Sequence, residues 1–184
     1  MKKLFIALMF MFITGIFGLC AEAQPEVQTP VPEVHTSSSE QGQLYGAMAV
    51  ETMHTFTPEE MLTYALEDER MAFAEYTLIM QKFDVSQPFS LIIEAEKKHE
   101  SLLLDLFKKY QFDVPSFDGS DHVMVPSSLQ DTYQVGVEAE IKNIDMYNKF
   151  LSYNLDEDMR EVFTELRDGS LNHLEAFKRQ ADKY

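Results

Sequence analysis

Tryptophan is absent from this chain, and a single cysteine, Cys20, lies close to its start. One thiol cannot form a disulfide within the chain, so a disulfide-stabilised fold is excluded. Glycine and proline occur seven times each, and most of them lie outside the long segments in which apolar residues recur periodically. Because both residue types interrupt helices, their placement favours long helices and an all-α domain.

Basic residues are also scarce. The chain has 15 lysines and arginines against 31 aspartates and glutamates, which gives a formal net charge of -16. Such a surface repels nucleic acid and anionic lipid, so we expect no nucleic-acid partner. A length of 184 residues suffices for one domain with a sizeable core and is too short for two comfortable ones.

The first residues have the pattern of an export signal. Lys2 and Lys3 form a basic start, residues 4–17 are apolar apart from one threonine and one glycine, and Ala21 and Ala23 supply the small side chains that signal peptidase recognises. We therefore predict a signal peptide over residues 1–23, cleavage after Ala23, and a periplasmic or secreted protein.

Two alternatives to cleavage stay open. Cys20 suggests a lipoprotein, although Leu19 stands where that processing prefers a small residue. An uncleaved anchor is the other alternative, but the apolar run is shorter than the roughly 20 residues that a membrane span needs. Cleavage after Ala23 would leave 13 basic and 30 acidic residues, no cysteine, and no stable membrane insertion.

Residues 24–56 are predicted to be a disordered tether before the folded domain. They repeat the tripeptide Pro-Glu-Val, contain a run of three serines, and offer too little apolar surface for a core. A short helical segment near residues 44–53 is compatible with the sequence. His35 and His54 lie in this stretch and are expected to be incidental.

The folded domain, residues 57–184, is predicted to contain four helices. Thr57, Pro58 and Glu60 form a capping box with proline at the first helical position, and Ser127 with Gln130 is expected to form a second. The predicted helices cover residues 57–83, 89–110, 127–154 and 159–182. The links between them are short, long and short, which is the pattern of a four-helix bundle with one crossover.

Each predicted helix carries an apolar stripe at alternating steps of four and three residues, as helices do when one face is buried. Near its middle, every stripe is interrupted by polar residues, namely Glu69, Glu96, His99, Glu140, Ser170 and His173. Other acidic residues fall off the stripes and are expected to face solvent: Glu67, Glu75, Glu94 and Glu138. Four helices thus place carboxylates and imidazoles at one level of the interior.

Buried carboxylates need a compensating charge. An unpaired buried ion costs several kcal/mol, and carboxylates that share one site repel each other. A divalent cation offsets both costs, and the i, i+3 spacing of Glu96 and His99 is that of carboxylate-bridged metal sites in bundles. Carboxylate and imidazole together suit iron, manganese or zinc better than copper(I). The same groups also allow a metal-free hydrogen-bonded network, because three carboxylates and two protonated histidines nearly cancel in charge.

The two halves of the domain resemble each other. Glu69 is followed by Tyr76 seven positions later, as Glu140 is by Tyr147. Glu96-Lys97-Lys98-His99 corresponds in the same way to Ser170-Leu171-Asn172-His173. The pattern suggests that the domain contains the same helix-pair unit twice.

These residues resemble the ligand pattern of the ferritin-like superfamily, which includes rubrerythrins and bacterioferritins. The closest similarity is to an uncharacterised, often exported family of prokaryotic ferritin-like domains. It rests on Phe89 before the helix with Glu-x-x-His, on Gly136 four residues before Glu140, and on the run from Gly169 to Phe177. The similarity covers residues 57–180.

The resemblance implies a ferritin-like four-helix bundle with a dinuclear site. Glu69 and Glu140 would each bind one ion, and two Glu-x-x-His motifs would supply bridging carboxylates and histidines. The chain departs from this pattern at Ser170, where the second bridging carboxylate is expected. The resemblance therefore implies one firm ion at Glu69, Glu96 and His99, and a weaker one at Glu140 and His173 that shares Glu96.

The expected function is that of a redox or metal-handling protein of the cell envelope. Iron at this site would react with oxygen or peroxide, which makes an iron-dependent oxidoreductase one interpretation. Tyr76 and Tyr147 are expected either to hydrogen-bond the ligands or simply to pack in the core. The alternative is a metal-free interaction module with a buried Glu/His network. Beyond metal ions, the sequence names no partner and leaves a homodimer open.

Overall fold

The computed structural model describes residues 43–184, and within that range all regular structure is helical. Its elements are α1 (Gly46–Thr52), α2 (Pro58–Phe83), α3 (Phe89–Tyr110), the 3-10 turn η1 (Ser120–His122), α4 (Leu129–Leu151) and α5 (Glu157–Ala181). The all-α class is therefore confirmed. Among these helices there is none with the length and apolar composition required to cross a membrane.

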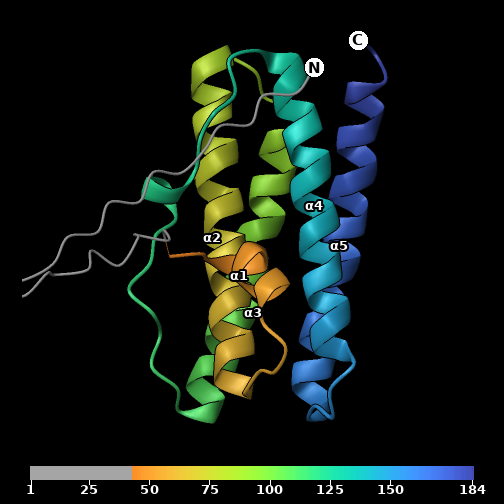
Figure 1. The fold of residues 1–184 in the computed structure, drawn as a ribbon. Helices are drawn as coiled ribbons and strands as arrows, with labels where there is room; N and C mark the ends of the chain where they lie inside the picture. The colour runs from red at the N-terminus through yellow and green to blue at the C-terminus, as the bar shows by residue number, and fades with distance from the viewer. Residues whose placement is uncertain (1–42) are drawn as a thin grey trace, which may run out of the picture. The chain divides into compact units, whose positions relative to one another are not determined.

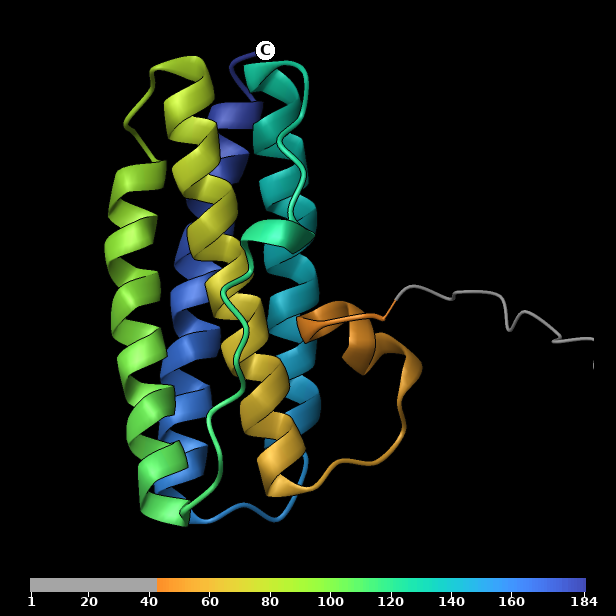
Figure 2. The same cartoon turned by 90° about the vertical axis from the view of Figure 1, so that its left-hand side faces the viewer.

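The four long helices form two antiparallel pairs, α2 with α3 and α4 with α5 (Figure 1). The link between α3 and α4 climbs the whole length of the bundle along α2, so α4 runs in the same direction as α3 (Figure 2). This crossover makes the arrangement ferritin-like, as the long middle link predicts. Across the bundle, α2 faces α4 and α3 faces α5.

The start of α2 has the predicted capping box. The Thr57 hydroxyl accepts the Glu60 N–H at 3.2 Å, and Glu60 Oε2 accepts the Thr57 N–H at 2.8 Å. The second predicted capping box is wrong, because Ser128 caps α4 by accepting the Asp131 N–H at 3.1 Å. Ser127 and Ser128 both carry a hydroxyl that can cap a helix, so the local sequence alone does not show which of the two is the cap. The bounds of α2 and α3 agree with prediction, whereas α4 ends before the predicted residue 154.

Part of the expected tether belongs to the bundle. Helix α1 lies against α2 and α4, and its Ala47 and Val50 are buried (Figure 1). Phe56 is also buried and packs edge-on against Phe150, with ring centroids 5.4 Å apart. Few apolar residues are enough here because α2 and α4 supply the rest of the contact surface. Residues 1–42 lie outside the described range, so the leader and the remaining tether stay predictions.

The attachment of α1 corrects the prediction for Glu67, which is buried and does not face solvent. Its Oε2 accepts the Gly46 N–H at 3.1 Å, and the neighbouring Asp68 accepts the Ala47 N–H at 2.8 Å. Gly46 has a φ of 52°, and a side chain there would meet Asp68 Oδ1 at 2.4 Å. Two carboxylates therefore satisfy amides at the start of α1 that its own turns leave unpaired.

Two apolar clusters fill the interior, one on each side of the polar level. The first contains Leu66, Leu103, Phe150 and Phe163 among others, all fully buried. The second is built around three aromatic side chains and two isoleucines: Tyr76, Phe89, Phe177, Ile79 and Ile92. Full burial of one such side chain contributes about 1.5–3 kcal/mol. The polar residues between the clusters are thereby kept away from water.

Candidate metal centre

All five predicted ligands, Glu69, Glu96, His99, Glu140 and His173, are buried, with exposed fractions between 2% for Glu69 and 6% for His173. They come from all four long helices, as the stripes predict. Because the axes of α2 to α5 lie nearly along one direction, residues in the middle of each helix reach the same level of the bundle. Whether these side chains hold a metal remains a prediction, but the required convergence is present.

The ligand atoms fall into two overlapping groups. Glu69, Glu96 and His99 form the first half-site, and Glu96, Glu140 and His173 form the second half-site. Within each group, one atom of every side chain lies within 4.8 Å of the corresponding atoms of the other two. Glu96 belongs to both groups, so its two oxygens connect the half-sites.

In the first half-site, the ring of His99 lies between two carboxylates. Its Nδ1 is 2.9 Å from Glu69 Oε2 and 3.1 Å from Glu96 Oε2. The second oxygen of Glu69 accepts a hydrogen bond from the Tyr147 hydroxyl at 2.6 Å. Gly169 makes room for the histidine, since a Cβ at that position would lie 2.5 Å from His99 Cε1.

The second half-site repeats this arrangement less completely. The Tyr76 hydroxyl donates to Glu140 Oε1 at 2.9 Å, as Tyr147 donates to Glu69. His173 Nδ1 lies 3.1 Å from Glu96 Oε1 and 3.5 Å from Glu140 Oε1. Neither contact is aligned as a hydrogen bond, so among the side chains of residues 43–184 this buried nitrogen is left without a partner. A bound cation would give it one.

Burial and the neighbouring charges shift the pKa values of these groups strongly. Burial and the adjacent Glu96 raise the pKa of Glu69 to about 7, whereas hydrogen bonds from the neighbouring side chains outweigh burial and lower the pKa of Glu96. Burial would lower the pKa of both histidines, but contacts with the carboxylates raise it to about 10. Without an ion, His99 and His173 therefore carry protons that a metal would displace.

Tyr76 and Tyr147 serve as fixed hydrogen-bond donors. Burial, reinforced by the nearby carboxylates, raises the pKa of both phenols well above the usual value. Each hydroxyl consequently keeps its proton and directs it at a glutamate of the facing helix. The hydrogen-bonding interpretation of these tyrosines fits the geometry, although both rings also pack in the core.

Ser170 stands where the second bridging carboxylate was expected, and it joins a polar chain that sequence reasoning missed. Its hydroxyl donates to Asn143 Oδ1 at 2.6 Å and faces the Leu166 carbonyl at 3.1 Å. Asn143 Nδ2 in turn donates to Asp68 Oδ2 at 2.5 Å. Asn143 lies three residues after Glu140, a spacing that puts both on one side of α4 and that could have revealed it.

The acidic residues outside the cluster divide into two kinds. Glu94 and Glu138 are exposed, as predicted. Glu75 is only partly exposed, and burial together with the charge of Asp68 raises its pKa to about 7. Its prediction as a solvated residue is therefore wrong, because the space between α2 and α4 encloses it in part.

The donor set fits a hard or borderline transition metal. Three carboxylates and two imidazoles match the preferences of iron, manganese and zinc, and the described part of the site contains no thiolate or thioether. His173 Nδ1, which lies close to two carboxylates but is hydrogen-bonded to neither, fits the same interpretation. The residues present are therefore suited to one or two divalent ions.

Comparison with known proteins gives three findings. Residues 60–181 match the family model described as Rubrerythrin. The uncharacterised protein MJ0754 of Methanocaldococcus jannaschii is 27% identical over 141 residues, which cover 68% of this chain and 76% of that protein. The crystal structure of hypothetical protein MJ0754 from Methanococcus jannaschii superimposes with a TM-score of 0.63 and 26% identity, covering 72% of this chain and 85% of that one.

Proposed function

Because the chain belongs to the rubrerythrin family and its bundle encloses two overlapping Glu/His half-sites, we propose that it is an exported protein that binds iron. Manganese and zinc suit the same donors and are the competing ions. The proposed role is metal handling or an iron-dependent oxidoreductase reaction with oxygen or peroxide. Export rests on the basic and apolar pattern of residues 1–23.

The observation that carries the proposal is the sharing of Glu96. One of its oxygens lies 3.1 Å from His99 Nδ1 and the other 3.1 Å from His173 Nδ1. A carboxylate placed between two histidines, with a further glutamate beyond each, is suited to bridge two cations. A protein that needed only a filled core would be more stable with apolar side chains at these positions.

Iron bound at this centre would supply one-electron redox chemistry toward oxygen or peroxide. Glu69, His99 and Glu96 would hold the ion of the first half-site. Tyr147 fixes the orientation of Glu69, and the apolar clusters on both sides exclude water from the charged groups. The two histidines would release their protons when the ion binds.

The two half-sites are proposed to differ in affinity. The first has a complete set of two carboxylates and one histidine whose nitrogen is well placed toward both. The second also contains two carboxylates and one histidine, but its histidine nitrogen is hydrogen-bonded to neither carboxylate, and Ser170 stands where a further carboxylate is expected. We therefore propose one firmly bound ion and one that exchanges more readily.

A second candidate function, a metal-free interaction module, is supported by a specific contact. His99 Nδ1 already has two carboxylate partners, so a protonated His99 can stabilise the first half-site without any ion. His173 Nδ1 has no such hydrogen bond, although it lies 3.1 Å from Glu96 Oε1. The two candidates therefore make opposite predictions about metal content.

Metal analysis of the purified protein distinguishes them. Anaerobic titration with ferrous iron should give a stoichiometric complex, followed by an absorbance change on addition of oxygen or peroxide. The Glu96→Ala variant should lose iron from both half-sites. Glu94→Ala removes an exposed carboxylate from the same helix and should behave as the wild type. A folded wild-type protein that ignores ferrous iron would favour the metal-free module.

Export is tested separately by fractionation of cells that express the full chain. Amino-terminal sequencing of the mature protein should begin at Gln24. Recovery of the intact chain in the cytosol would contradict this part of the proposal without affecting the metal site.

A further inference from the structure

A hollow of about 440 Å³ opens between α2 and α4, beside α1. Its lining includes Asp68, Ala72, Glu75 and Tyr76 of α2 and Glu138 and Ala139 of α4; we refer to it as the α2/α4 hollow. Residues of α1 and of the segment after η1 complete its wall. Neither metal coordination nor core packing requires an open space at this position.

Tyr76 connects this hollow with the metal centre. Its side chain lines the hollow, and its hydroxyl donates to Glu140 Oε1 at 2.9 Å. A single aromatic side chain therefore stands between the open space and a ligand of the second half-site. Tyr147, which holds the corresponding ligand Glu69, is fully buried within the apolar cluster.

A second connection runs through Asp68. This carboxylate also lines the hollow, and it accepts the hydrogen bond from Asn143, which in turn accepts one from Ser170. Ser170 occupies the place of the missing second bridging carboxylate. Both connections thus end at the second half-site, whose coordination is the less complete.

From these contacts we propose that the α2/α4 hollow is the vestibule through which a divalent cation enters and leaves the second half-site. The inference rests on the proposed function, because it requires an ion to admit. Three carboxylates line the hollow, and its lysine, Lys142, is paired with Glu51 at 3.4 Å. The remaining negative charge raises the local concentration of cations at the entrance.

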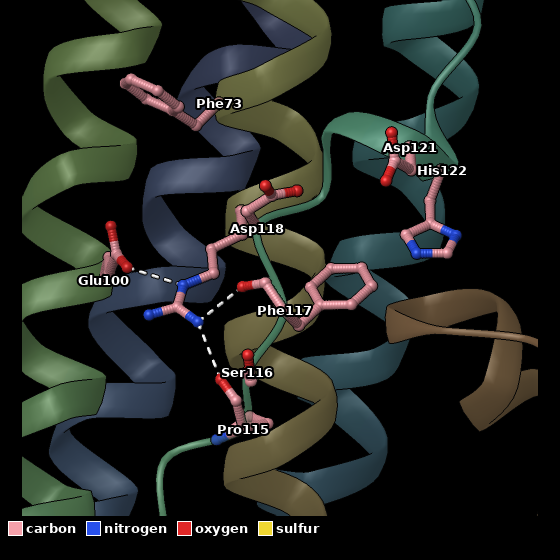
Figure 3. A pocket seen from close by; sticks show the side chains of 9 residues that line it. Phe73, Glu100, Pro115, Ser116, Phe117, Asp118, Asp121 and His122 are labelled. Carbon is pink, nitrogen blue, oxygen red and sulfur yellow. Dashed lines mark hydrogen bonds and ion pairs between the residues drawn. The ribbon is translucent and has the colours of Figure 1, made fainter.

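The larger hollow on the neighbouring face is unsuited to this role. It measures about 720 Å³, lies between α2, α3 and the segment before η1, and is lined by Phe73, Glu100 and Asp118 among others (Figure 3). Arg70 extends into it, with Nε 2.7 Å from Glu100 Oε1 and Nη1 hydrogen-bonded to the carbonyls of Pro115 and Phe117. Arg70 therefore occupies part of this hollow, and among the described residues no side chain of its lining is hydrogen-bonded to a predicted ligand.

The test compares rates of metal uptake in two variants that place the same ring in different hollows. Ala139→Phe fills the α2/α4 hollow, and Ser116→Phe adds a phenyl ring to the larger one. The probe is cobalt(II), whose visible absorbance reports coordination, mixed rapidly with the ion-free full chain. We expect Ala139→Phe to slow uptake about tenfold or more without changing the final number of ions, and Ser116→Phe to leave the rate unchanged.

A charge variant keeps the test decisive if Ala139→Phe fails to fold, which thermal melting would reveal. Glu138 is exposed, so Glu138→Lys preserves packing while reversing a charge at the entrance. It should slow uptake severalfold at low salt, and the difference should shrink at high salt because exposed charges are screened. An unchanged uptake rate in the folded variants, or slow uptake in Ser116→Phe, would contradict the proposed entry route and leave the proposed function intact. A wild-type protein that takes up no cobalt or iron would overturn the proposed function and the route with it.

Discussion

The two helix pairs of this bundle, α2–α3 and α4–α5, share one framework but differ in some of the polar residues around the candidate metal centre. Glu69 and Tyr76 of the first pair correspond to Glu140 and Tyr147 of the second, and each tyrosine donates to the glutamate of the other pair. These two hydrogen bonds connect the pairs at the level of the candidate metal centre.

The difference lies at Glu96 and its counterpart Ser170. Glu96 contacts both histidines, whereas Ser170 turns its hydroxyl toward Asn143 and away from a bridging role. Asn143 then passes the hydrogen-bond chain to Asp68 at the surface hollow. One pair has a candidate ligand at this position, and the other has a chain of hydrogen bonds that leads to Asp68 at the hollow. Four experiments test this difference between the two helix pairs.

The largest effect is expected when the missing carboxylate is restored. Ser170→Glu should raise the affinity for the second ion about 100-fold, because a charged ligand replaces a hydroxyl. It should also destabilise the ion-free protein, since a fourth carboxylate enters the buried cluster. Isothermal titration with ferrous iron or manganese measures the first effect and chemical unfolding the second. Ser170→Gln has the same size without the charge, and an equal gain in that variant would contradict the explanation.

The next largest effect concerns the glycine that accommodates His99. A Cβ at residue 169 would lie 2.5 Å from His99 Cε1, so Gly169→Ala should displace the ring and cost about 1–3 kcal/mol in the free energy of unfolding. It should also weaken the first ion. In α3 the corresponding residue is Ala95, and Ala95→Gly should cost only the helix propensity of about 1 kcal/mol, with no change in metal affinity. Equal metal affinities in the two variants would show that the contact is unimportant.

A smaller effect is expected from the two tyrosines, and it should differ between the half-sites. Tyr147→Phe removes the donor to Glu69 and should weaken the first ion about tenfold, while Tyr76→Phe should do the same for the second ion only. Stepwise titration that resolves the two ions measures this difference. Identical effects on both ions would contradict the assignment of one tyrosine to each half-site.

The smallest effect is the pH dependence that Asp68 of the first pair contributes to stability. Burial raises the pKa of Asp68 from 3.8 to about 6, so the folded state binds its proton more tightly than the unfolded state. The associated stability is fully present below pH 3.8 and is lost as the pH rises through about 6. The corresponding residue of α4 is Ala139, which cannot titrate. Between these pH values the Asp68→Asn variant should lose less free energy of unfolding per pH unit than the wild type. The difference should correspond to at most one bound proton, and urea unfolding at several pH values measures it.

Most of the fold and the main cluster were predictable because they depend on helix periodicity. The spacing of Leu66, Glu69 and Phe73 along one face shows that a buried stripe is interrupted by a carboxylate, and the same reasoning locates the other ligands. Glu67 and Glu75 were misjudged for a related reason. They lie off the stripe, but α1 and the space between α2 and α4 cover them, and periodicity carries no information about such additional contacts.

The amino-acid pattern alone was enough to predict the four long helices, their apolar faces, the long crossover and the polar level within the core. These follow from side-chain direction along a helix, which depends only on neighbours within a few residues. The packing of the helices was needed to show that Tyr147 reaches Glu69, that His173 Nδ1 has no hydrogen-bond partner, and that Ser170 binds Asn143. Such contacts join residues on different helices, and their geometry depends on how far each helix is rotated and shifted against the next. Local sequence preferences do not specify that packing to the accuracy of a hydrogen bond.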